Sequence, residues 1–141
     1  MSQLKVVTAL NTGSSRVKKF EFSPRRAQTV QHIDSLVLAW HRNEIDESAL
    51  AKGLIDIRTH CQTKEEIWHY LNAIEKIPSG LVPGMLVIGT ALRLMRSSCA
   101  SERAKAYIAL ANLTVNDKDS KADASRILKS ALARELHSVK T

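Results

Sequence analysis

Apolar residues recur at every third or fourth position over most of this chain, and this period constrains its fold more than any other feature. The pattern begins directly after Ser23, where Ile33, Val37 and Trp40 would share one face of a helix. It continues in five further stretches. We therefore expect helices over about 24–43, from near 46 through 61, and over 63–78, 85–97, 101–113 and 120–138.

Signals for helix starts support this division. Ser23 followed by Pro24 is typical of a helix start, because proline fits the first helical position. Thr63 and Glu66 have the spacing of a capping box, in which each side chain accepts a hydrogen bond from the backbone N–H of the other. Ser120 predicts the start of the last helix.

The composition agrees with a helical core. Of the 141 residues 44% are hydrophobic, but only six are aromatic, so Leu, Ile, Val and Ala must fill the interior. This length fits one domain without disulfide support. We expect an all-α (mainly α) domain over residues 24–141, with five to six helices in a compact orthogonal or bundle-like array around the fourth.

Residues 1–23 differ from the rest. β-branched and aromatic residues lie on both sides of the turn-rich segment 11–15, which favours a short N-terminal β-hairpin. An isolated ribbon is only marginally stable in water, so it would have to pack on the helices or on a second subunit. An extended basic arm is the equal alternative.

The sequence has no stretch of the roughly 20 apolar residues that a membrane span needs. The N-terminus also lacks the apolar run of a signal peptide, so we expect a cytoplasmic protein without membrane association. In that reducing compartment Cys61 and Cys99 would be buried free thiols.

Positive charge is concentrated at the two ends. The net charge is +7, with +5 in residues 1–26, −3 in residues 27–84 and +5 in residues 85–141. Such a layout would attract a polyanion to both ends, although many proteins of similar charge bind none.

The last expected helix is amphipathic and basic. At 100° per residue, its cations fall within an arc of about 160°. They are Lys118, Lys121, Arg126, Lys129, His137 and Lys140. Most of the opposite side is apolar, with Ala124, Ile127, Leu128, Ala131, Leu132 and Val139. The cations could bind phosphates, or they could form an ordinary solvated face.

The N-terminal segment supplies a second set of cations, Arg16, Lys18, Lys19, Arg25 and Arg26. Phe20 and Phe22 lie among them. These phenylalanines could stack on unpaired bases or could pin the arm to the core.

Trp40 and Trp68 suggest a different class of function. Partly exposed tryptophans are frequent anchors of protein–protein contacts. The competing interpretation is that both belong to the core.

Sequence-specific DNA recognition is not supported. A helix-turn-helix with its turn at Gly53 would put the polar residues Thr59 and Gln62 where apolar residues should follow. Any nucleic-acid binding would therefore rest on charge.

Catalytic and metal motifs are also missing from the sequence. His60, Cys61 and His69 match no zinc-finger spacing. The adjacent carboxylates Glu65 and Glu66 would point about 100° apart on a helix, not into one cleft. We expect no metal, no cofactor and no enzymatic activity.

The leading hypothesis is a small non-enzymatic regulatory or accessory protein that binds DNA or RNA, mainly at the backbone, as a homodimer. The residues assigned to this role are Arg16, Lys18, Lys19, Arg25, Arg26, Lys121, Arg126, Lys129 and Lys140. The alternative is an adaptor or inhibitor that docks on an acidic protein surface through the same basic helix, with Trp40 or Trp68 as an anchor.

Overall fold

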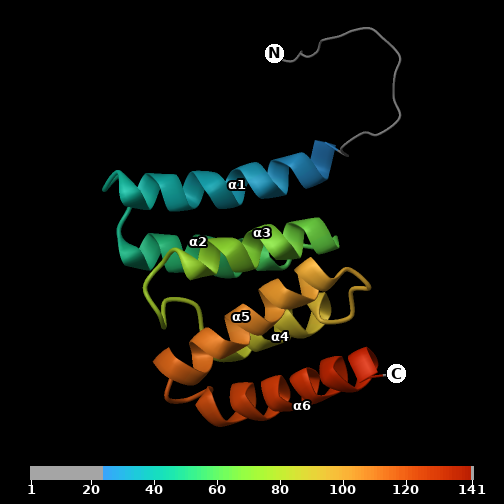
Figure 1. The fold of residues 1–141 in the computed structure, drawn as a ribbon. Helices are drawn as coiled ribbons and strands as arrows, with labels where there is room; N and C mark the ends of the chain where they lie inside the picture. The colour runs from blue at the N-terminus through green and yellow to red at the C-terminus, as the bar shows by residue number, and fades with distance from the viewer. Residues whose placement is uncertain (1–23, 141) are drawn as a thin grey trace, which may run out of the picture.

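The computed structural model describes residues 24–140 as six α-helices, so the expected all-α class is confirmed for this part of the chain (Figure 1). The helices are α1 (Pro24–His41), α2 (Glu47–Arg58), α3 (Lys64–Glu75), α4 (Gly84–Leu94), α5 (Ala100–Asn116) and α6 (Lys121–Lys140). Residues 24–140 contain no strand. The predicted hairpin or arm of residues 1–23 lies outside the described residues.

Side-chain caps begin two of the helices. The Thr63 hydroxyl accepts a hydrogen bond from the Glu66 N–H at 3.1 Å, and the Glu66 carboxylate accepts one from the Thr63 N–H at 2.9 Å. This is the predicted capping box of α3. At the start of α2, the Asp46 carboxylate accepts from the Ala49 N–H at 2.8 Å. Such a cap stabilises a helix by about 1 kcal/mol.

The odd-numbered helices α1, α3 and α5 lie side by side, and α1 runs in the same direction as α3. In the first half of both helices, the Thr29 hydroxyl donates a hydrogen bond to the Glu66 carboxylate. At their ends, His41 and Lys76 line the same surface depression. The two helices therefore begin together and end together.

α3 and α5 are also parallel. The Lys105 ammonium lies 4.5 Å from the centre of the Trp68 ring, which joins their first halves. Near their ends, Ile74 and Leu113 line one cavity. The direction of the chain thus repeats from each odd-numbered helix to the next.

The even-numbered helices return the chain between these parallel helices. α4 packs against α3 and α5, and α6 packs against α5. The result is a layered stack with α1 at one end and α6 at the other (Figure 1).

The expectation of an array centred on α4 needs correction. α3 contacts α1, α4 and α5, and α5 contacts α3, α4 and α6, so these two helices form the middle of the stack. α4 instead leaves Met85 (62%) and Leu92 (40%) exposed on its outer side. Its nearly continuous apolar sequence does not distinguish a central helix from one that is covered on a single side.

Gly84, the first residue of α4, allows the start of α6 to approach closely. A Cβ atom there would collide with the Ser120 hydroxyl and the Asp117 carboxylate. That carboxylate holds the turn before α6, because it accepts hydrogen bonds from the N–H groups of Asp119 (3.0 Å) and Ser120 (3.2 Å). The position of α6 therefore depends on the absence of a side chain at Gly84.

Among residues 24–140, no helix is both long enough and apolar enough to cross a membrane.

Candidate binding surface on the last helix

α6 is attached to the stack by a narrow inner face. Ala124 and Ala131 are fully buried, and Ile127 and Leu128 pack against the core while staying partly exposed. Because two of these four side chains are methyl groups, α6 buries little apolar area for a helix of 20 residues.

A polar cluster completes the attachment of α6 near its end. Arg103 of α5 donates through Nε to Glu135 Oε2 at 2.6 Å and through Nη2 to Oε1 at 3.3 Å. The Tyr107 hydroxyl donates to the same Oε2 at 2.5 Å. Arg103 also donates to the Ser97 carbonyl oxygen at 3.1 Å. We call Arg103, Tyr107 and Glu135 the polar latch.

The electrostatics of the polar latch favour an ionised Glu135. The hydrogen bonds from Arg103 and then from Tyr107 lower the pKa of the Glu135 carboxyl, because both stabilise its charged form. Partial burial and the hydrogen bond to Glu135 raise the pKa of the Tyr107 hydroxyl, which therefore stays protonated and donates. The latch thus fixes α6 to α5 around neutral pH.

The side of α6 beyond the latch is both apolar and basic. Glu135 marks the contact with α5. Continuing around α6 from this residue, six of the described side chains fall within about 120° of arc. They are Leu128, Lys121, Leu132, Ser125, Leu136 and Lys129. We call these six residues the outer face of α6. None of them is acidic.

Two leucines of the outer face are exposed to solvent. Leu132 is 44% exposed and Leu136 is 64% exposed. The sequence pattern had assigned Leu132 to the buried side, and this expectation is wrong. At 100° per residue Leu132 lies at the edge of the cationic arc and Leu136 lies within it, beyond the region that α5 covers.

The predicted cations of α6 are exposed. Lys121, Arg126 and Lys129 gather with Lys118 around an open, shallow depression. Arg126 is 3.3 Å from Asp123 and lies farther around the helix from the leucines than Lys129 does. The free positive charge next to the leucines therefore comes from the lysines.

The structure does not bring the two predicted halves of the nucleic-acid surface together in the described part of the chain. Arg25 and Arg26 lie in the first turn of α1, at the opposite end of the stack from α6 (Figure 1). Their side chains and that of Lys140 are not among those described, and Arg16, Lys18 and Lys19 lie outside the described residues.

The two tryptophans are partly buried and lie away from α6. Trp40 packs on the core in α1 beside His41, with 4.8 Å between the ring centres. Trp68 packs on the core in α3, where Lys105 covers its ring. Neither tryptophan therefore shares a surface with the basic helix, as a common docking site would require.

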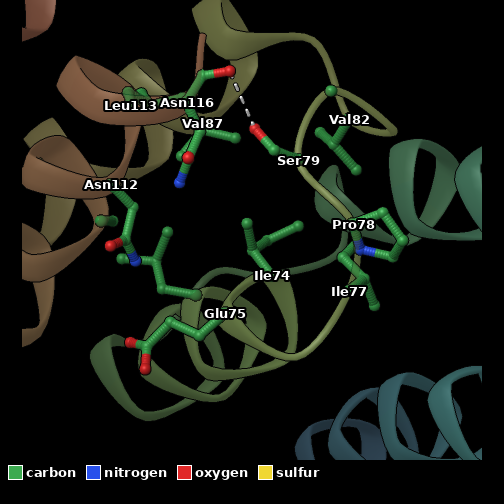
Figure 2. A pocket seen from close by; sticks show the side chains of 13 residues that line it. Ile74, Glu75, Ile77, Pro78, Ser79, Val82, Val87, Asn112, Leu113 and Asn116 are labelled. Atoms are coloured by element: carbon green, nitrogen blue, oxygen red, sulfur yellow. Dashed lines mark hydrogen bonds between the residues drawn. The ribbon is translucent and has the colours of Figure 1, made fainter.

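A cavity of about 200 Å³ lies between α3, α5 and the turn that joins α3 to α4 (Figure 2). Aliphatic side chains such as Ile74 and Val87 line it, with Asn112 and Ser79 among its polar residues. The Ser79 hydroxyl donates to the Asn116 carbonyl oxygen at 3.4 Å. The cavity lies on the α3 side of α5, away from the outer face of α6.

The two cysteines have different environments. Cys61 is buried, and burial raises the pKa of its thiol to about 11. Cys99 is exposed, contrary to the expectation of a buried thiol, because it precedes the first turn of α5 at the surface. A hydrogen bond with the Ser101 hydroxyl lowers the pKa of Cys99. Within the described residues, no three His, Cys, Asp or Glu side chains are placed to hold a metal ion.

Sequence reasoning missed Leu136 and the polar latch. Leu136 could have been found on the same helical projection that placed the cations, because it lies in the middle of their arc. The latch had no local signal, since Arg103 and Glu135 are 32 residues apart.

No protein-family model, curated protein or solved structure matches this chain. Its function has to be inferred from the surface of α6 itself.

Proposed function

We propose that this chain is a non-enzymatic binding protein that recognises an acidic protein surface through the outer face of α6. One observation carries the proposal: two exposed leucines and two exposed lysines lie on the same side of α6, the last helix of the described residues. Leu132 and Leu136 supply apolar contact area, and Lys121 and Lys129 supply positive charge beside it.

This combination suits a protein partner. Apolar side chains at the centre of an interface give most of the binding energy, while charges at the edge select the partner and speed its association. Exposed leucines gain nothing from a phosphate backbone, which is bound by cations and backbone N–H groups.

Nucleic-acid binding stays a prediction and is the competing outcome of the test. The exposed cations of α6 favour it, but the acidic residues Asp117, Asp119 and Asp123 dilute their charge. The described start of α1 also lies at the far end of the stack from α6.

The test is a selection from a display library of random 18-residue peptides against the full chain, followed by measurement of affinity by fluorescence anisotropy. We expect the recovered peptides to be rich in Asp, Glu and apolar residues. Lys129→Glu and Leu136→Ser should each weaken their binding about tenfold or more.

Two matched variants control for charge and for apolar surface. Lys52→Glu on α2 makes the same charge change at another exposed lysine, which lies 3.6 Å from Asp56, and Met85→Ser removes an equally exposed apolar side chain from α4. Both should bind the peptides like the unmodified chain.

A mixed-sequence duplex DNA and a single-stranded RNA are measured in parallel. If they bind, and Lys129→Glu weakens them while Leu136→Ser does not, the nucleic-acid hypothesis replaces the proposal. Recovered peptides without acidic residues, or equally sensitive to the control variants, would also overturn it.

A further inference from the structure

In the described stack, α6 lacks the second odd-numbered neighbour that α4 has. α4 packs against α3, with which it forms a pair, and also against the next odd-numbered helix, α5. α6 occupies the same place in its own pair, against α5. The described residues end with α6, so the position next to both α5 and α6 is not filled by this part of the chain.

The exposed residues of α5 mark one wall of that position. Tyr107 is the point at which α5 meets α6, through its hydrogen bond to Glu135. Continuing around α5 from Tyr107 in the direction of Val115, five apolar residues fall within the next 100° of arc or so. They are Ala100, Ala111, Ala104, Val115 and Ile108, of which Ala104 and Ile108 also border Trp68 and His69 of α3.

The two largest of these side chains are exposed to solvent. Val115 is 80% exposed and Ile108 is 46% exposed. Exposed apolar residues that are contiguous on a monomer usually mark a contact site.

The outer face of α6 forms the other wall. On this face Leu128, Leu132 and Leu136 follow Glu135 around α6. The opposite flank of α6, near Arg134, borders the end of α4 at Met95. The three leucines therefore lie on the side away from α4. Two apolar walls thus begin at the polar latch, one on α5 and one on α6. This is the surface that a further odd-numbered helix would cover, as α5 covers α4.

We infer that the acidic partner contributes an amphipathic α-helix that packs against α5 and α6 together and runs parallel to α5. The inference rests on the proposed function and specifies the form of the partner segment. Its apolar side would cover Val115, Leu132 and Leu136, and its acidic side chains would lie against Lys121 and Lys129.

Charge complementarity selects this occupant over a second copy of the chain. The outer face of α6 has two lysines and no carboxylate, and the α5 wall has no charge at all. Two copies of α6 packed together would bring lysines into an interface without acidic partners, which is unfavourable. An acidic helix pairs with the same lysines.

The expected direction follows from the helix ends. α5 and α6 are antiparallel, because Arg103 near the start of α5 binds Glu135 near the end of α6. A helix parallel to α5 would begin beside Leu136 and end beside Lys121. A lysine near a helix C-terminus also interacts favourably with the negative end of the helix dipole.

The experiment uses an acidic peptide from the selection above, bound to the full ¹⁵N-labelled chain. Circular dichroism of the mixture should show helix formation beyond the sum of the components. A peptide of the same composition, with apolar residues alternating at every second position, should bind about tenfold more weakly or worse.

Direction is measured with a nitroxide at either end of the peptide. A label at its N-terminus should broaden the amide signal of Leu136, and a label at its C-terminus should broaden that of Lys121. Val115→Ser should weaken binding about fivefold or more by removing the α5 wall, while Met85→Ser should not.

The outcomes separate this inference from the proposed function. If Lys129→Glu and Leu136→Ser weaken binding, but the labels report the reverse direction or Val115→Ser has no effect, the proposed function stands and the parallel helix is wrong. If the two peptides bind equally in spite of their different apolar spacing, the segment is not a helix. If sedimentation shows dimers that Leu136→Ser dissociates, a second copy is the occupant.

Discussion

α3 and α6 are both amphipathic helices, but the stack covers them differently. α3 lies between α1 and α5 and packs on α4, so Ile67, Tyr70 and Leu71 are buried completely or nearly so. α6 lies at the end of the stack and meets α5, so Leu132 and Leu136 stay exposed. An inner helix uses its apolar residues for stability, whereas an end helix leaves some of them exposed to solvent.

The largest contrast between the two helices is expected on truncation of a leucine. Leu71→Ala should lower the free energy of unfolding by about 2–5 kcal/mol, because it leaves a cavity in the core. Leu132→Ala should change it by less than about 1 kcal/mol, since Leu132 is already half exposed. Urea denaturation of both variants checks the difference, and equal losses would contradict it.

Gly84→Ala tests how α6 is seated. The added methyl group would collide with Ser120 and Asp117, so we expect a loss of about 1–3 kcal/mol in unfolding free energy. Gly89→Ala is the control, because a Cβ at Gly89 meets nothing within 4 Å. Alanine also favours helix, so this control should be neutral or stabilising. Two equally destabilised variants would mean that the close contact of Gly84 with Ser120 and Asp117 is unimportant.

Thr63→Ala should destabilise the chain by about 1 kcal/mol through loss of the α3 cap.

The pKa of Glu66 bears on the same cap. Burial raises this pKa, but the hydrogen bonds from Thr63, Gln62 and Thr29 outweigh burial and lower it below its ordinary value of 4.5. Ionised Glu66 therefore contributes stability that is complete above pH 4.5 and is lost as the pH falls through the lowered pKa.

Denaturation between pH 6 and pH 3 measures this contribution. The unmodified chain should lose stability more steeply with falling pH than Glu66→Gln, which cannot titrate. Parallel pH profiles of the two proteins would exclude a role for ionised Glu66 in the cap.

Tyr107→Phe should have a smaller effect, because it removes one hydrogen bond of a partly exposed latch. We expect a loss below about 1 kcal/mol in global stability. Amide hydrogen exchange should increase in residues 128–138 and not in α3, because the latch holds only the end of α6. Uniformly increased exchange would show that the latch supports the whole stack.

The smallest expected effect is that of Leu136→Ser on folding. Its exposed side chain contributes little to the core, so the unfolding free energy should change by no more than about 0.5 kcal/mol. The same variant is expected to lose affinity for the partner. A large loss of stability would place Leu136 in the fold and would remove the main support for the binding surface.

Local features of the sequence were enough to find the helices. The capping box at Thr63 and the apolar period each involve residues within a few positions, and both are confirmed. Helical projection also found the exposed cations Lys121, Arg126 and Lys129. The assignment of Leu132 to the buried side was wrong, because at 100° per residue Leu132 lies at the edge of the cationic arc, beyond the part of α6 that α5 covers.

The sequence by itself therefore determined the all-α class of residues 24–140, the approximate ends of each helix and the basic character of α6. Hydrogen bonds and caps within a helix connect residues that are near in sequence, so a linear pattern contains them. Only the tertiary structure decided that α1 and α6 lie at opposite ends of the stack, that Arg103 and Tyr107 hold Glu135, and that Leu132 and Leu136 face solvent. These features depend on which helices meet, and that follows from packing among residues far apart in the chain.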